Sequence, residues 1–205
     1  MSIVAKTYRG DIVDLTHIGH IAVVDHKGQI LHYFGDPKRV TFARSSAKPM
    51  QAIPVVESGA VEKYGIDKRE IALFTASHSG EDFHVKAAES ILDKAGLSKN
   101  HLQCGIHYPL NAKVRDKMKR EGLEAETIHN NCSGKHAGML VTTKYYGDDL
   151  ESYYKKDHPT QKRVLKTIAD ICQYEEEKII LGVDGCGVPV HAMPLYKFAQ
   201  GYARL

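Results

Sequence analysis

The sequence predicts an α+β protein of mixed α/β character. Two β-branched runs separated by a glycine-containing turn lie between residues 20 and 34, which is typical of a β-hairpin. Helical periodicity dominates the rest of the chain, with single apolar runs between the helices. Strands and helices therefore do not alternate as a sheet of βαβ units requires. With 42% hydrophobic and 26% charged residues, the 205-residue chain has the composition of a globular protein with a sizeable core.

The first elements expected are strands. Residues 20–25 and 29–34 form the hairpin around a turn at 26–28, and Gly35-Asp-Pro37 ends it. Further strands are expected at 40–42, 71–76 and 178–182. The run at 71–76 is apolar enough to be buried and leads into a turn of small residues.

Six helices are expected from apolar periodicity and from the glycines that follow several of the segments. They cover residues 48–58, 81–95, 111–120, 133–146, 160–174 and 194–205. Pro54 counts against the first helix, because proline removes a helical hydrogen bond.

Charge and hydropathy exclude several classes of partner. The net charge is +3, and the densest basic segment, 113–120, is typical of the solvated face of a helix rather than of a nucleic-acid patch. No apolar stretch is long enough for a membrane span, and residues 1–11 are too polar for a signal peptide. We therefore expect a cytoplasmic protein that binds neither nucleic acid nor membranes.

The first motif that could carry chemistry is Ser45-Ser-Ala-Lys48. Residues three apart on a helical turn are neighbours, so the lysine amine could contact the first hydroxyl. Removal from water lowers the pKa of a lysine and makes a neutral amine available as a base for a serine nucleophile. The alternative is a capped helix start with a lysine that extends its amine to the solvent.

The second motif, Thr75-Ala-Ser-His-Ser-Gly-Glu81, joins the expected buried strand to a helix. Hydroxyls and backbone N–H groups at such a position suit an anion or a developing oxyanion. A helix cap at Ser79 would explain part of the motif, but not Ser77 or His78.

The third motif is residues 130–138, NNCSGKHAG. It is similar to a phosphate-binding loop, but His136 follows Lys135 where Ser or Thr is needed, and His129 replaces the first glycine. We therefore do not expect nucleotide binding. What remains is a thiol, an amine and an imidazole just before a helix.

The fourth motif is residues 183–189, VDGCGVP, in which glycines flank Cys186. On an extended segment Asp184 and Cys186 point the same way, and thiolates and carboxylates are common zinc ligands. Cys104 and Cys172 are interpreted as small buried apolar residues. With no close cysteine pair, we expect thiols or metal ligands rather than disulfides.

Together these motifs make the chain similar to the Rhizobium-type (class 3) L-asparaginases, a family distinct from the threonine-nucleophile and plant-type asparaginases. The segments that carry the resemblance, in chain order, are Tyr8-Arg-Gly10, Gly19-His-Ile-Ala-Val-Val24, Arg44-Ser-Ser-Ala-Lys-Pro49, Ala76-Ser-His-Ser-Gly80, Asn131-Cys-Ser-Gly-Lys-His136 and Val183-Asp-Gly-Cys-Gly-Val-Pro189.

The resemblance implies a fold akin to the serine β-lactamases and glutaminases, and hydrolysis of L-asparagine to L-aspartate and ammonia. Carried over by position, it implies one Ser–Lys pair, Ser45 with Lys48, and a second pair to which Ser77 belongs. It also implies a zinc ion surrounded by Cys132, Lys135 and Cys186, with Asp184 close by. Ser45 is the expected nucleophile and Lys48 its base, with Ser77 as the alternative nucleophile.

Members of this family are longer than 205 residues, and the lysine that pairs with the second serine lies outside the matched segments. Residues 1–205 are therefore expected to form a single amidohydrolase domain that is truncated at its C-terminus. We therefore expect the 205-residue chain alone to be a poor or inactive asparaginase. The last helix would lack a partner surface, so we expect either self-association, most simply as a homodimer, or poor solubility.

Three other interpretations remain open. Ser45-Ser-Ala-Lys48 also fits a penicillin-recognising serine acyltransferase or β-lactamase, but the accessory S-D-N and K-T-G motifs are absent. A zinc- or thiol-based regulatory fragment without activity would use only the cysteine motifs. Glutamine could replace asparagine as the substrate.

Overall fold

A computed structural model describes residues 2–205 of the chain. The chain forms two compact units, each assembled from separate segments. The first unit holds the residues up to Ala43 together with Ile168–Ile180 and His191–Leu205. The second unit holds Arg44–Thr167 and Leu181–Val190.

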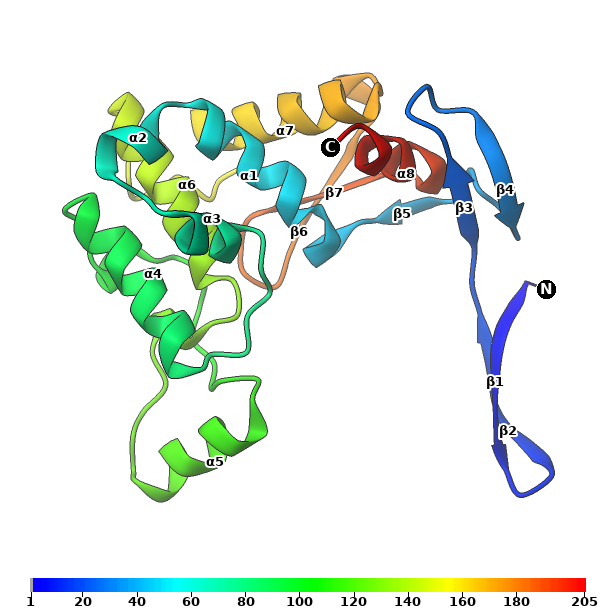
Figure 1. Cartoon of the computed structure of the whole chain (residues 1–205), viewed down its shortest axis with the longest axis horizontal. Helices are drawn as coiled ribbons and strands as arrows, with labels where there is room; N and C mark the ends of the chain where they lie inside the picture. The colour runs from blue at the N-terminus through cyan, green and yellow to red at the C-terminus, as the bar shows by residue number, and fades with distance from the viewer. Residues whose placement is uncertain (1) are drawn as a thin grey trace. The chain divides into compact units, whose positions relative to one another are not determined.

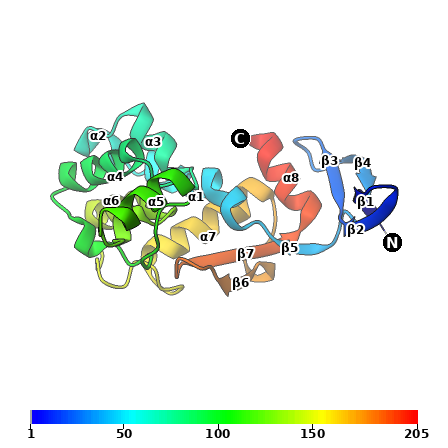
Figure 2. The same cartoon turned by 90° about the horizontal axis from the view of Figure 1, so that it is seen from below.

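The first unit contains two β-hairpins and a helix. β1 (Ile3–Arg9) pairs antiparallel with β2 (Ile12–Ile18), and β3 (Ile21–Val24) pairs antiparallel with β4 (Ile30–Phe34). α8 (Leu195–Arg204) packs on β3 (Figure 2). The β3–β4 hairpin confirms the one expected at 20–34. The sequence analysis missed β1 and β2, because strands that are exposed along their whole length show no alternation of apolar and polar residues.

A three-stranded sheet has the order β5 (Val40–Phe42), β7 (Pro189–Pro194) and β6 (Ile180–Val183). β5 and β7 are antiparallel, with Thr41 opposite Met193. The strands at 40–42 and near 178–182 were expected, whereas β7 was not. β7 carries a proline at each end, and prolines usually indicate that a strand does not form.

The second unit is helical, and its helices pack around α6 (Ser133–Tyr146). α1 (Lys48–Glu57), α3 (Lys68–Phe74) and α4 (Asp82–Lys94) each contact α6 (Figure 1). α6 is buried from Ser133 to Thr143. It places the third sequence motif inside the unit.

Two glycines of α6 allow α3 to approach closely. A Cβ atom on Gly134 would lie 2.6 Å from the carbonyl oxygen of Leu73. A Cβ atom on Gly138 would lie 2.9 Å from Cδ1 of Phe74. Both positions therefore require glycine for steric reasons, although glycine weakens a helix.

The remaining helices are α2 (Ala60–Tyr64), α5 (Ala112–Arg120) and α7 (Pro159–Cys172), with 3₁₀ turns at Arg44–Ala47, Lys99–His101, Thr127–His129 and Glu176–Lys178. All six expected helices are confirmed within a few residues. α1 continues through Pro54, and α5 buries Met118 while its basic side chains face the solvent. Among residues 2–205, no helix combines the length and apolar character needed to cross a membrane.

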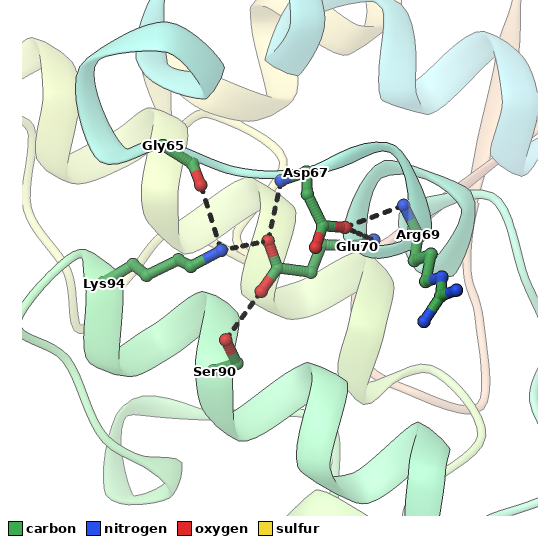
Figure 3. Close-up of polar contacts among 6 residues, drawn as sticks. All are labelled: Gly65, Asp67, Arg69, Glu70, Ser90 and Lys94. Carbon is green, nitrogen blue, oxygen red and sulfur yellow. Dashed lines mark hydrogen bonds and ion pairs between the residues drawn. The ribbon is translucent and has the colours of Figure 1, made fainter.

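The strand expected at residues 71–76 is wrong, because residues 71–74 belong to α3 and Thr75 caps the end of that helix. The Asp67 carboxylate accepts hydrogen bonds from the N–H groups of Arg69 and Glu70, and Glu70 accepts one from the Asp67 N–H. This capping box starts a helix (Figure 3). The sequence signal for this helix is the capping box, which lies before most of the apolar run. A short apolar run does not by itself distinguish a strand from a helix.

Glu70 also links α3 to α4. Glu70 is 4% exposed, and its carboxylate accepts hydrogen bonds from Ser90 Oγ at 2.7 Å and Lys94 Nζ at 2.6 Å (Figure 3). The buried charge is thus paired and hydrogen-bonded, which is the condition for tolerating it away from water. The cluster fixes the two helices that lie on either side of the second motif.

Candidate active site

The second unit contains a small polar pocket of about 190 Å³ that gathers residues from distant parts of the sequence. Its lining residues are Arg44, Ser45, His107, Asn130, Asn131, Cys132, Asp184, Gly185 and Cys186. The first, third and fourth sequence motifs therefore meet at this pocket. A larger cleft of about 540 Å³ near Asn100 and Asp149 contains none of the motif residues.

Local backbone structure positions each side chain. Ser45 lies on the 3₁₀ turn before α1, and Lys48 is the first residue of α1. Cys132 is the residue that precedes α6. Asp184 and Cys186 lie in the turn between β6 and β7, which closes with hydrogen bonds from Gly187 N to the Asp184 carbonyl and from Asp184 N to the Val188 carbonyl.

Lys48 is buried, with 1% of its surface exposed, so it does not extend its amine to the solvent. Its Nζ donates to the carbonyl oxygens of Ala76 at 2.7 Å and Asn131 at 3.3 Å. Burial lowers the pKa of Lys48, and the neighbouring Cys132 opposes this shift. An amine in such a place is more easily deprotonated than that of an exposed lysine.

Ser45 is exposed and borders the pocket. Within the described part of the chain, the hydrogen bonds of Lys48 Nζ go to the two carbonyls and to Cys132, and none joins it to Ser45. The structure thus brings Ser45 to the pocket without closing the expected pair. Roles for both residues stay predictions.

Ser77 lies beside the pocket through Asn131. Its Oγ accepts a hydrogen bond from Asn131 Nδ2 at 2.7 Å, and Asn131 also lines the pocket. The alternative interpretation of Ser79 as the cap of α4 is wrong: Glu81 holds the cap position, and the Ser79 hydroxyl donates to its carboxylate.

His78 is buried behind the second motif. Its Nε2 lies 2.8 Å from Ser133 Oγ, and its Nδ1 accepts the Gly80 N–H. Burial lowers the pKa of His78 to about 4, so the ring is neutral at physiological pH. These bonds tie the second motif to the start of α6, which is a structural role.

Cys132 and Cys186 lie together at the base of the pocket, each 5% exposed. A hydrogen bond between them lowers the pKa of Cys186 and raises the pKa of Cys132. Lys135 Nζ donates to Cys186 Sγ at 3.1 Å. These contacts favour the thiolate form of Cys186 over that of Cys132.

Asp184 connects the thiols to the pocket rim. Its Oδ2 lies 3.9 Å from Cys186 Sγ, and its Oδ1 lies 3.6 Å from a guanidinium nitrogen of Arg44. Arg44 has a positive φ of 49°, a strained value for a residue other than glycine. Such strain is often found at functional sites, and the sequence analysis gave Arg44 no role.

The donor atoms at the base of the pocket are compatible with zinc. Two sulfurs and the Lys135 amine converge there, and sulfur and nitrogen are the ligands that zinc prefers. Among residues 2–205, no group of three or more His, Cys, Asp or Glu side chains has the arrangement of a metal site. Lys135 would have to be neutral in order to ligate the metal.

The other two cysteines lie outside this cluster. Cys104 and Cys172 are buried free thiols, and burial raises the pKa of both. This agrees with their interpretation as small apolar residues.

Sequence reasoning missed His107 and Tyr153, and it noted the imidazole of His136 without giving it a role. His107 Nε2 lies 3.1 Å from Asn131 Oδ1 and accepts the Asn131 N–H. His136 and Tyr153 are buried next to the thiols. Nothing in the spacing of these residues indicates that they would meet.

Comparison with known proteins gives one family. The sequence model of the L-asparaginase II family matches residues 5–205. A search of curated proteins gives no match.

Proposed function

The chain belongs to the L-asparaginase II family, and from this premise we propose that it hydrolyses L-asparagine to L-aspartate and ammonia. The observation that supports the proposal best is the pocket, where Ser45 and two oppositely charged side chains, Arg44 and Asp184, line one small space. At about 190 Å³ this space is smaller than the sites of drug-sized ligands, which suits an amino acid.

The charges of the pocket are complementary to a free amino acid. The Arg44 guanidinium suits an α-carboxylate, because it can donate two parallel hydrogen bonds. The Asp184 carboxylate, with its side chain 14% exposed, suits an α-ammonium group. We propose that substrate replaces the 3.6 Å Arg44–Asp184 contact with these two interactions.

In the proposed reaction, Ser45 Oγ attacks the side-chain amide carbon and Lys48 takes the hydroxyl proton. Backbone N–H groups hold the tetrahedral oxyanion, and Lys48 returns the proton to the amide nitrogen, so that the C–N bond breaks and ammonia leaves. Water then attacks the acyl-enzyme, with Lys48 taking its proton and giving it to Ser45 Oγ as aspartate is released. The burial of Lys48 supports its role, since a desolvated amine is a better base. Lys48 must turn from the Ala76 carbonyl toward Ser45 when substrate binds, and such catalytic contacts often form only in the complex.

Ser77 is the alternative nucleophile. It is exposed beside the pocket, and its hydrogen bond to Asn131 orients the hydroxyl. Replacement of each serine in turn separates the two assignments.

We propose that Cys132, Lys135 and Cys186 hold a zinc ion, with Asp184 beside them. When bound, the zinc would position the substrate rather than generate hydroxide, because two thiolates reduce its Lewis acidity. Metal analysis of the purified chain tests the site: zinc should be stoichiometric in the wild type and absent from a Cys132→Ala, Cys186→Ala double variant. Stoichiometric zinc that survives in the double variant would rule the site out.

Two further proposals follow from the family. The α+β units are proposed to form a serine β-lactamase/glutaminase-like fold, and the chain is proposed to act as a cytoplasmic homodimer. The exposed apolar side chains of β1 and β2 support self-association.

The experiment that tests the function is ammonia release from L-asparagine by the 205-residue chain, with L-glutamine as a parallel substrate. We expect release from asparagine in excess of that from glutamine, because the pocket is small. Absence of release from both substrates by a folded, zinc-loaded chain would contradict the proposal.

A further inference from the structure

We propose that Asn131 is a positioning residue, whose side-chain amide holds the Ser77 hydroxyl as a hydrogen-bond donor at the reacting end of the pocket. The hydroxyl would donate to the oxyanion that forms on the side-chain amide of the substrate, beside the backbone N–H groups. Because this role belongs to the proposed reaction, it rests on the proposed function. As an oxyanion donor Ser77 keeps its proton, whereas a nucleophile gives its proton up to a base.

Asn131 is the residue through which three parts of the site meet. Its backbone oxygen accepts hydrogen bonds from Lys48 Nζ at 3.3 Å and from the His78 N–H at 3.2 Å. Its backbone N–H donates to His107 Nε2 at 3.2 Å. These bonds use only backbone atoms of Asn131, so they fix the residue and leave its side-chain amide for another task.

The side-chain amide of Asn131 is held at both ends. Nδ2 donates to Ser77 Oγ at 2.7 Å, and Oδ1 lies 3.1 Å from His107 Nε2. Asn131 and His107 both line the pocket, so the amide lies at the pocket wall. Ser77 is exposed and lies within hydrogen-bond distance of this wall, so its hydroxyl is open to a molecule in the pocket.

The bond from Asn131 decides what the Ser77 hydroxyl can do. A hydroxyl has one proton and two acceptor lone pairs, and the amide of Asn131 occupies one of the lone pairs. Among residues 2–205, no group accepts the proton of Ser77. A ligand in the pocket can therefore accept it, and the hydroxyl is held as a donor.

The contacts of Lys48 place Ser77 at the reacting end of the pocket. Lys48 Nζ donates at 2.7 Å to the carbonyl of Ala76, the residue before Ser77, and at 3.3 Å to the carbonyl of Asn131. In the proposed reaction this amine takes the proton of Ser45, so the substrate amide lies close to it. A donor beside the amine suits the amide carbonyl oxygen, which becomes the oxyanion.

An oxyanion donor acts mainly in the transition state, so its loss lowers kcat and changes KM little. We expect Ser77→Ala and Asn131→Ala each to lower kcat for L-asparagine by roughly 100–1,000-fold, the usual effect of removing one such donor. Ser79→Ala is the matched control. It removes a hydroxyl of the same turn that donates to Glu81, and it should leave kcat unchanged.

Two further variants separate positioning from a general effect on the fold. If Asn131 acts through Ser77, the Ser77→Ala, Asn131→Ala double variant has about the same kcat as Ser77→Ala alone. Asn131→Asp keeps the shape of the side chain but replaces the donating Nδ2 by an oxygen that accepts the Ser77 proton. It should therefore be no more active than Asn131→Ala, whereas a merely structural role would make it the milder change.

The contact itself is measured without turnover, by ¹H–¹⁵N NMR of the side-chain amides of the full chain. The Asn131 signal is identified by its absence from the spectrum of Asn131→Asp. We expect Ser77→Ala to shift this signal, because the bonded N–H loses its acceptor. Ser79→Ala should leave the signal in place.

Multiplied losses of kcat in the double variant would overturn the proposal, as would an Asn131 signal that Ser77→Ala does not move. If Asn131→Ala does not fold, which thermal unfolding shows, Asn131→Asp and the spectrum of Ser77→Ala still decide. A wild type without turnover whose Asn131 signal depends on Ser77 would contradict the proposed function alone. An active wild type with unchanged kcat in Asn131→Ala would contradict the positioning role alone.

Discussion

At the scale of single residues, Lys48 shows how burial gives a side chain a chemical role. A lysine that is 1% exposed loses most of its hydration, and two carbonyls and a thiol replace it only in part. Lysine is seldom buried in this way without a function. The apolar residues that follow it in α1 keep water away, since Met50, Ala52 and Val55 are buried.

We expect Ser45→Ala and Lys48→Ala to lower asparagine turnover by several orders of magnitude, because each removes a nucleophile or its base. Lys48→Arg should be as damaging, since arginine stays charged and cannot accept the proton. The adjacent Ser46→Ala variant is the matched control, and steady-state ammonia release is the measurement. If Ser45→Ala keeps its turnover and Ser77→Ala loses it, Ser77 is the nucleophile.

His78 leads to a prediction about stability and pH. Its pKa is lowered to about 4 in the folded chain from an ordinary value of 6.5. Between these values the unfolded chain binds more protons, so the free energy of unfolding falls as pH falls from 6.5 to 4. The full effect is on the order of 3 kcal/mol, at about 1.4 kcal/mol per pKa unit.

Urea unfolding at several pH values between 4 and 7.5 measures how steeply the free energy of unfolding changes with pH. The His78→Gln variant should lose most of it, whereas replacement of the exposed His32 by Gln should leave it unchanged. Equal slopes in the wild type and His78→Gln would show that another group titrates in this range.

At the scale of elements, the sequence predicted helices better than strands. α4, α5 and α6 have apolar faces several turns long or clear end signals, so their existence could be inferred. The existence of α3 could not be inferred, because its apolar run is short and the capping box lies before that run. The strands β1 and β2 were missed, since neither face of that hairpin is buried within its unit.

The packing of α3 on α6 leads to a prediction about two glycines. Glycine to alanine in a helix usually adds up to about 1 kcal/mol of stability. At Gly134 the new Cβ would meet the Leu73 carbonyl oxygen at 2.6 Å, and this backbone atom cannot move without shifting α3. We therefore expect Gly134→Ala to destabilise the chain by about 1–3 kcal/mol.

Gly138→Ala is the matched comparison on the same helix. Its new Cβ would meet the Phe74 ring at 2.9 Å, and a ring can rotate more easily than a backbone. The expected loss is smaller, and urea unfolding of both variants measures the difference. An increase in stability for Gly134→Ala would show that α3 is not held this close to α6.

At the scale of the whole molecule, the candidate site shows what the sequence can and cannot predict. The residue types in each motif indicate the chemistry that the motif could carry, such as the hydroxyl of Ser45 and the amine of Lys48. That Cys132 and Cys186 would share a hydrogen bond follows only from the fold, because the turn between β6 and β7 brings them together. The proximity of Arg44 to Asp184 likewise depends on the fold, because the two residues lie far apart in the sequence.

The exposed hairpin β1–β2 leads to a prediction about assembly. Large apolar side chains are exposed along both strands, with Ile12 at 75% and Leu15 at 55%. The hairpin also carries Lys6 and Arg9 beside Asp11 and Asp14, so two copies would meet without net repulsion. Apolar surface of this kind marks an interaction site, and we expect the occupant to be a second copy of this chain.

Light scattering coupled to size-exclusion chromatography should therefore give the mass of a dimer, with dissociation on dilution. A Leu15→Lys substitution should shift the equilibrium toward monomer, because it places a charge in the apolar contact. Thr16→Lys adds the same charge on the same strand at a polar position and should leave the dimer intact. A monomeric wild type at all concentrations would contradict the homodimer, and equal masses for the two lysine variants would place the contact elsewhere.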